Sequence, residues 1–137
     1  MATISELIRE EADGTLSFGD YTLASKTKKE DFAAGGASYK VKTFKEITKL
    51  ERDGYFVYES TPGTAVGNFN GSKEGAVFTV DGAEDAQITL EFEPETEYSV
   101  IIDGKDTGNI KTNLGGKLSL SVELDEGKSV KVEIKKA

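Results

Sequence analysis

The sequence predicts a mainly β protein, an antiparallel sandwich preceded by one short helix. Two observations favour this class. In the segment 86–103, apolar and polar residues alternate, which is the period of a strand with one buried face and one face in solvent. After residue 62, a glycine stands at every break between such segments, at a spacing of about ten residues that is typical of short antiparallel strands.

The N-terminal segment predicts the helix. The residues Thr3-Ile4-Ser5-Glu6 match a capping box, in which two side chains satisfy each other's backbone amides. A helix over residues 4–12 would place Ile4, Leu7 and Ile8 on one face. Because so short a helix is not stable alone, we expect this face to dock on the sheets.

The rest of the first half, residues 1–61, is rich in strand and turn signals. Alternation over residues 39–43 indicates a strand with one buried face. Gly35-Gly36 and Asp53-Gly54 indicate turns on either side of it. Residues 55–58, with the sequence Tyr-Phe-Val-Tyr, are the most apolar run of this half and predict a further strand.

A turn at Pro62-Gly63 marks the expected boundary between two regions. We predict a helix plus a β-rich region in residues 1–61 and a sandwich in residues 62–137. The two regions would pack firmly together or form one compact unit. Seven strands are expected in the second region, at about 65–70, 76–80, 86–92, 98–103, 109–112, 117–124 and 129–135.

A bend between two of these strands has a recognisable pattern. Phe92-x-Pro94-x-Thr96-x-Tyr98-x-Val100 resembles the corner between strands E and F of fibronectin type III and related immunoglobulin-like sandwiches. The resemblance implies an immunoglobulin-like sandwich in residues 62–137. It also implies that the Tyr98 hydroxyl bonds to backbone upstream of it and fixes the corner.

Composition excludes several classes of site. The chain has no cysteine and no histidine, so disulfides, Ser-His-Asp and Cys-His catalytic groups, and the usual zinc and iron–sulfur sites cannot form. We therefore predict no cofactor. The net charge of −8 argues against nucleic acid as a partner, because phosphate binding needs a basic surface.

Apolar segments are too short for a membrane span of about 20 residues, so no membrane partner is expected. The first residues lack the basic start and apolar core of a secretory signal. We therefore expect a cytoplasmic protein, or else a processed or trimmed chain.

Charge is distributed unevenly along the chain. The net charge is −4 in residues 1–25, +4 in residues 26–52 and −8 in residues 53–137. A basic patch on one copy could therefore meet an acidic patch on another. The candidate binding residues are four tyrosines able to stack on sugars or anchor an interface, and two lysines of the basic middle: Tyr21, Tyr39, Tyr55, Tyr58, Lys40 and Lys42.

Acidic residues form two further groups. Glutamates at alternate positions from Glu91 to Glu97 are expected to lie on the solvent face of a strand, where they favour solubility. Paired carboxylates of a glycoside hydrolase are the remote alternative. Asp81, Glu84 and Asp85 could hold calcium from a turn, and the sequence leaves this open.

As a whole, the chain resembles a family of small bacterial proteins labelled endosialidase or endosialidase-like. The residues that carry the resemblance are Ser17–Tyr21, Tyr39–Phe44, Tyr58–Thr64 and Thr112–Lys117. The label implies cleavage of sialic acid, for which such enzymes use an arginine cluster and often a tyrosine. This chain has two arginines, Arg9 and Arg52, so we predict no enzyme of that kind.

These observations lead to a ranked set of expected functions. The first is a non-enzymatic structural or protein-interaction module that assembles with itself, or with a protein partner, through strand edges and complementary charge. The second is a carbohydrate-binding module, and a carboxylate-based hydrolase is third. A cleft that joins aromatic and acidic side chains would favour the second function, and an unpaired strand edge would favour the first.

Overall fold

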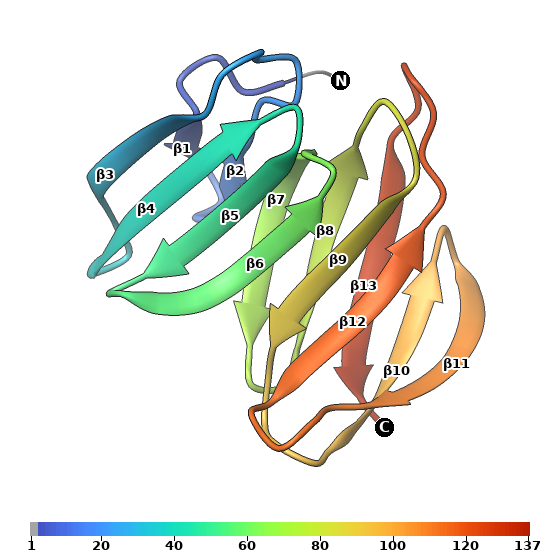
Figure 1. Ribbon diagram of the computed structural model, residues 1–137. Coiled ribbons are helices and arrows are strands. Elements are labelled where there is room, and N and C mark those ends of the chain that lie inside the picture. The colour runs from blue at the N-terminus through green and yellow to red at the C-terminus, as the bar shows by residue number, and fades with distance from the viewer. Residues whose placement is uncertain (1–2) are drawn as a thin grey trace.

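A computed structural model describes residues 3–137 as two antiparallel sheets packed face to face (Figure 1). Sheet A contains, in spatial order, β1 (Ile8–Glu10), β2 (Leu16–Phe18), β7 (Ala65–Ser72), β8 (Gly75–Asp81), β13 (Val130–Lys136), β10 (Glu97–Ile102) and β11 (Lys105–Lys111). Sheet B contains β12 (Lys117–Val122), β9 (Ala86–Glu91), β6 (Tyr55–Thr61), β5 (Ile47–Arg52), β4 (Ala37–Phe44) and β3 (Thr27–Ala34). The prediction of a mainly β sandwich is confirmed.

The predicted N-terminal helix is wrong, because the described part of the chain contains no helix. Residues 8–10 instead form β1, with Ile8 opposite Phe18 of β2. The Ile4 amide donates to the Gly19 carbonyl at 3.0 Å, and the Gly19 amide donates to the Leu7 carbonyl at 3.0 Å. Pairing with β2 therefore supplies the backbone bonds that an isolated short helix could not secure. Ile4 and Ile8 are buried all the same.

All seven strands predicted after residue 62 are present, but their arrangement differs from the immunoglobulin order. Five of them lie in sheet A and two, β9 and β12, lie in sheet B. An immunoglobulin sandwich of the constant type divides seven strands into four and three. The difference arises because β9 pairs with β6 and β7 pairs with β2, so strands from both sides of residue 61 share each sheet.

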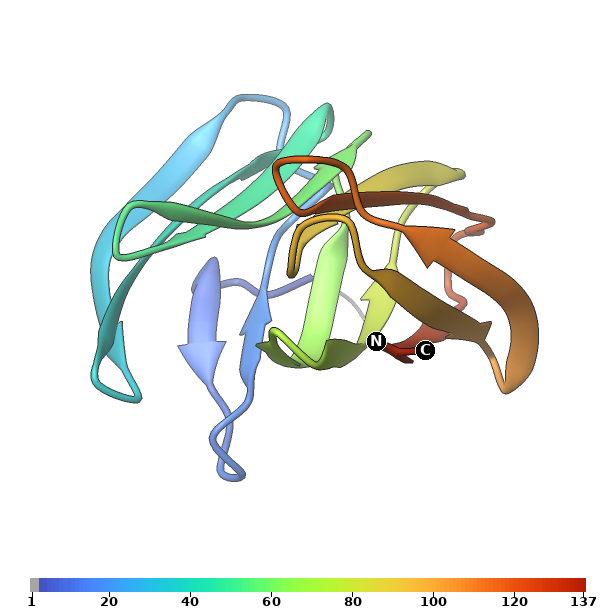
Figure 2. The ribbon, with the colours of Figure 1, turned by 90° about the horizontal axis from the view of Figure 1, so that it is seen from below.

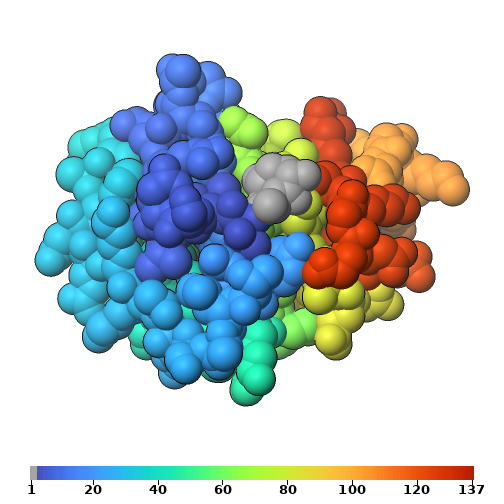
Figure 3. All heavy atoms as spheres, turned by 90° about the horizontal axis from the view of Figure 1, so that it is seen from above, coloured from blue at the N-terminus to red at the C-terminus, as the bar shows by residue number. Residues whose placement is uncertain are grey.

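The two sheets enclose one core, and Figure 2 shows β3–β6 of sheet B in a layer across from β1 and β2 of sheet A. At its centre the Tyr58 ring meets Phe18 and Phe78 edge to face, with ring centroids 5.3 and 5.8 Å apart. This geometry sets the positive edge of one ring against the negative face of another. Seen from above, the N-terminal segment and the β2–β3 connection cover one end of the sandwich (Figure 3).

A buried chain of hydroxyl groups connects the loops of this end to the core. Thr48 Oγ1 donates to the Thr64 carbonyl at 2.8 Å and accepts from the Thr64 amide at 3.0 Å. A hydroxyl has one proton, so Thr43 Oγ1, 2.8 Å away, must be the donor in its bond to Thr48. Thr43 Oγ1 in turn accepts from the Asp20 amide at 2.9 Å. The hydroxyl protons of Thr43 and Thr48 and both backbone groups of Thr64 therefore all have a hydrogen-bond partner.

The same chain continues into the aromatic core. Thr64 Oγ1 lies 2.8 Å from the Tyr58 hydroxyl and 2.8 Å from Ser60 Oγ. Burial raises the pKa of Tyr58 well above its usual range, although its bonds to Thr64 and Ser60 partly offset the effect. A Cβ at Gly19 would collide with the Thr64 carbonyl, so this close approach of two loops requires glycine.

The bend between β9 and β10 has the hydrogen bonds that its pattern predicts. The Tyr98 hydroxyl accepts from the Glu93 amide at 3.1 Å and donates to the Lys73 carbonyl at 2.7 Å. Its ring stacks on Phe92, with centroids 4.7 Å apart. One side chain therefore fixes the bend and ties it to the β7–β8 turn.

We predict that Thr48→Val lowers the free energy of unfolding by about 3 kcal/mol, because it leaves both backbone groups of Thr64 without this partner and the proton of the Thr43 hydroxyl without its acceptor. The measurement is urea unfolding followed by circular dichroism. Thr89→Val, whose hydroxyl bonds only at the surface, is the control and should stay within about 0.5 kcal/mol of wild type. Equal effects at the two sites would contradict the role given to the network.

We predict that Tyr98→Phe costs about 1–2 kcal/mol of unfolding free energy, because the Glu93 amide and the Lys73 carbonyl lose their partner. Tyr55→Phe removes a hydroxyl from an exposed ring and provides the matched control. Chemical denaturation of both variants tests the prediction. If the two substitutions had the same effect, the corner would not depend on the hydroxyl.

We also predict that stability falls as pH rises above about 10, where an unfolded tyrosine ionises. The raised pKa of Tyr58 means that the folded state keeps its proton while the unfolded state releases it, so the stabilisation is complete below this pH and is lost above it. Tyr58→Phe should show a shallower decline between pH 9 and 11 in the same unfolding measurement. Parallel pH profiles for the two proteins would refute this assignment.

Candidate functional site

An open cleft of about 760 Å³ lies between the sheets, where the β5–β6 hairpin diverges from the β7–β8 hairpin. Most of its lining residues belong to the β5–β6 turn with the start of β6 and to the end of β7, and these segments are at the lower ends of the two strands in Figure 1. Seven lining residues carry large apolar or aromatic side chains: Leu16, Tyr39, Tyr55, Phe56, Val57, Phe69 and Phe92. The other side chains that line it are polar, and most carry a charge: Arg52, Asp53, Asn70, Ser72, Lys73 and Glu91.

The β5–β6 turn positions one wall of the cleft. Asp53 and Gly54 both have positive φ, at 50° and 82°, which gives the tight turn that the sequence predicts. Asp53 Oδ1 accepts from the Ser38 amide at 2.9 Å, and the Asp53 amide donates to the Ser38 carbonyl at 2.7 Å. The turn is thereby fixed to the neighbouring β3–β4 hairpin, and it holds Tyr55 with 75% of its surface exposed.

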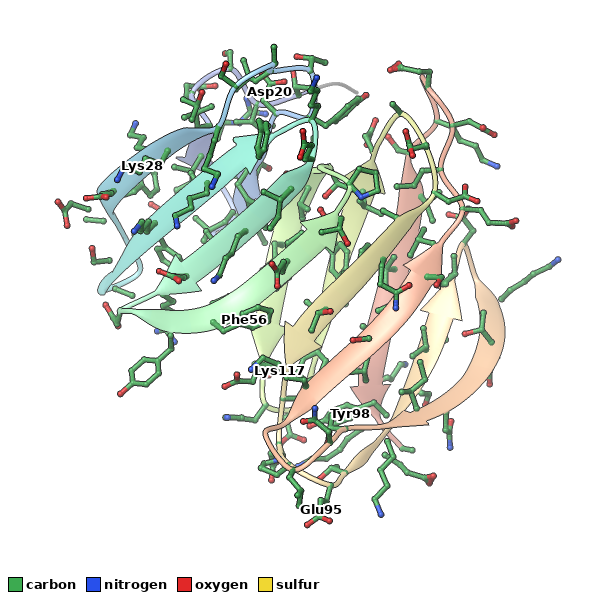
Figure 4. All side chains as sticks on the ribbon, in the orientation of Figure 1. Asp20, Lys28, Phe56, Glu95, Tyr98 and Lys117 are labelled. Atoms are coloured by element: carbon green, nitrogen blue, oxygen red, sulfur yellow. The ribbon has the colours of Figure 1, made fainter. Side chains whose placement is uncertain are left out.

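Aromatic rings line the cleft at different depths. Phe69 and Phe92 are buried at its base, whereas Phe56 and Tyr39 are half-buried. In Figure 4, Phe56 of β6 and Lys117 of β12 lie close together on sheet B. The Lys117 Nζ atom is 4.6 Å from the Phe56 ring centroid, within the range of a cation–π contact.

Three polar side chains of the cleft are free to bind a ligand. Within residues 3–137, the Arg52 guanidinium and the Lys73 ammonium make no ion pair, and the Asn70 amide makes no side-chain hydrogen bond. The two carboxylates are engaged, because Asp53 accepts from the Ser38 amide and Glu91 pairs with Lys117 at 2.9 Å. Donors for a neutral or anionic ligand are therefore available.

The structure brings together two of the six predicted binding residues, Tyr39 and Tyr55, in this cleft. Tyr58 lies fully buried in the core and cannot contact a ligand. Its position on β6 follows the alternation of that strand, which turns it away from solvent. Tyr21 lies near the opposite end, where partial burial and Glu126 raise its pKa.

Lys40 and Lys42 are placed outside the cleft, on the solvent face of sheet B. Lys40 pairs with Glu30 at 3.7 Å. Lys42 stands opposite Lys28 on one side and Lys49 on the other, so three lysines align across β3, β4 and β5. Like charges directly opposite each other destabilise a sheet, but Lys28 pairs with Glu30 at 3.2 Å and Lys49 pairs with Glu51 at 3.6 Å, which offsets this repulsion.

The acidic turns serve as ties between loops. The Ser129 hydroxyl donates to Asp81 Oδ1 at 2.7 Å, and the Leu124 amide donates to Asp85 Oδ1 at 3.0 Å. Among residues 3–137, no group of three or more acidic side chains is placed to hold a metal ion. Over the same residues, no helix is long and apolar enough to cross a membrane.

Sequence reasoning did not find Arg52, Phe56 or Asn70 as site residues. Arg52 and Phe56 flank the predicted turn, but Asn70 comes from β7 in the other sheet, so only the fold brings them together. Comparisons with protein-family models, with characterised proteins and with solved structures found no match. The function is therefore argued from the geometry of the cleft.

Proposed function

We propose that the protein is a non-enzymatic carbohydrate-binding module and that the cleft is its binding site. The observation that supports this most is the combination of an exposed aromatic, Tyr55, with an unpaired guanidinium, Arg52, in one open cleft. Ligand sites are typically concave and mostly apolar, with a few polar groups that fix orientation. The cleft has both components.

The chemistry of a sugar ring suits these walls. A pyranose has an apolar face of C–H groups and a rim of hydroxyls. The C–H face stacks on the electron-rich face of an aromatic ring, for which Tyr55 and Tyr39 are the accessible candidates. The hydroxyl rim needs donors and acceptors in fixed directions, which Arg52 and Asn70 supply.

Binding without turnover is proposed because of the state of the two carboxylates in the cleft. Glycoside hydrolysis usually needs two facing carboxyl groups about 5–9.5 Å apart, one of them held as an acid. Here Asp53 accepts from the Ser38 amide of the neighbouring hairpin, and Glu91 pairs with Lys117 at 2.9 Å. Both carboxylates of the cleft are therefore engaged with the protein itself, and the cleft offers no free pair to face a glycosidic bond.

A glycan-array screen followed by titration calorimetry tests the proposal. We expect Tyr55→Ala to weaken binding to the best glycan at least about tenfold, which corresponds to about 1.4 kcal/mol of lost stacking. Leu114→Ala is the matched control, because Leu114 is 80% exposed and does not line the cleft. Arg52→Ala should also weaken binding, whereas the glycan should be recovered intact.

Two results would overturn the proposal. One is the absence of binding by the wild-type protein across a broad glycan set at millimolar concentration. The other is a bound glycan whose affinity is unchanged in both Tyr55→Ala and Arg52→Ala, which would place the ligand elsewhere on the surface.

A further inference from the structure

The edges of the two sheets differ in how they are protected. Each sheet has two edge strands, β1 and β11 in sheet A and β3 and β12 in sheet B. An unprotected edge presents backbone groups that can pair with another chain, and natural sheets block this with short strands, bulges and charges. Three of the four edges have such features, and β12 lacks them.

The protected edges use different means. β1 has three residues. β3 is irregular between Lys29 and Phe32, and the two residues between them, Glu30 and Asp31, are charged. β11 has a shift in its pairing with β10, a φ of +106° at Gly108 and a lysine at each end.

The pairing of β12 with β9 is regular over its full length. Its six residues pair without a shift, from Lys117 opposite Glu91 to Val122 opposite Ala86. The sequence Lys-Leu-Ser-Leu-Ser-Val contains no proline, no glycine and no charge after its first residue. Within residues 3–137, no strand pairs with its other side.

The direction of each backbone group follows from one hydrogen bond. The Phe92 amide donates to the Gly116 carbonyl at 2.7 Å, and these two residues lie directly opposite each other in the β9–β12 register. Hydrogen-bonded and non-bonded pairs alternate along antiparallel strands. The amides and carbonyls of Lys117, Ser119 and Ser121 therefore point away from β9.

The backbone amide and carbonyl of Lys117 confirm that these groups point away from β9, and both already have a partner. Its amide donates to Asn113 Oδ1 at 2.9 Å, and its carbonyl accepts from the Asn113 amide at 3.1 Å. The outward backbone groups left for another chain are those of Ser119 and Ser121, both exposed residues. They provide two donors and two acceptors on one edge.

We propose that β12 pairs with β12 of a second copy, antiparallel, about a two-fold axis at Leu120. In this register Ser119 lies opposite Ser121 of the second copy, and Ser121 lies opposite Ser119 of the second copy. The outward amides and carbonyls of both serines are then hydrogen-bonded in each copy. Leu118 and Val122 stay on the core side of the joined sheet, as they are within one copy. Sheet B would thus continue from one copy into the other.

Charge selects the partner and the register. At each end of the pairing Lys117 would meet Glu123 of the second copy, and opposite charges across strands favour pairing. With the axis at Leu120, Lys117 and Glu123 need to meet through their side chains alone, because Asn113 already occupies the Lys117 backbone. Moving the axis to Ser119 would pair the Ser121 backbone with that occupied Lys117 backbone and would leave Glu123 opposite Gly115. A self-complementary edge with opposite charges at its two ends fits a second copy of the same chain.

Sedimentation velocity over a concentration series, at low and high salt, tests the proposal. We expect a monomer–dimer equilibrium. Ser119→Pro should weaken the dimer at least about tenfold, because it removes an outward amide that the fold of one copy does not use. Circular dichroism checks that this variant is folded.

Charge reversal tests the register. Glu123→Lys should weaken the dimer more at low salt than at high salt, and Glu126→Lys, an exposed loop residue with the same charge change, should not. The double variant Lys117→Glu with Glu123→Lys should recover dimerisation. A wild-type monomer at all concentrations, or a dimer that survives both Ser119→Pro and Glu123→Lys, would overturn the proposal. Tyr55→Ala should leave the dimer intact, so this test is independent of the cleft.

Discussion

The buried hydroxyl chain that begins at Thr43 and ends at Tyr58 is the constraint on which the rest of the sandwich depends. It joins the connections β2–β3 and β6–β7, both of which cross from one sheet to the other, to strands β4, β5 and β6. Hydrophobic burial brings two sheets together but does not specify how their crossing loops meet. A polar network in a buried core does so, because any other arrangement leaves buried groups without partners.

The cleft is a consequence of this constraint. One end of β6 is held by Tyr58 and Ser60 through Thr64, so that end lies close to sheet A. The other end begins at the β5–β6 turn, which is tied by Asp53 to the β3–β4 hairpin and not to sheet A. Because the two ends of β6 are anchored to different parts of the molecule, the strand diverges from β7 and the space between them stays open.

Lys117 connects the two proposed interaction sites. Its Nζ atom lies over Phe56 of the cleft and pairs with Glu91, while its backbone closes the start of the unprotected edge through Asn113. A sugar in the cleft and a second copy at β12 would both lie within reach of this side chain.

The sequence by itself determined which residues are buried in a strand and where most strands of the second half begin and end. Alternation over residues 86–103 placed Ile88, Leu90 and Tyr98 inside, and the resemblance of residues 92–100 to a fibronectin type III corner implied the backbone bond of the Tyr98 hydroxyl. These features are local, because strand period and turn chemistry act between residues close in the chain.

Only the tertiary structure decided which strands pair. Ile4 and Ile8 could lie equally well on one face of a helix or on one side of a strand. Residues 8–10 form a strand because β2 supplies the backbone partners. Tyr55 and Tyr58 are equally aromatic in sequence, yet one is exposed in the cleft and the other is the centre of the core. Backbone groups are chemically identical along the chain, so the partner of each strand is set by packing between distant segments, and the cleft and the free edge follow from that choice.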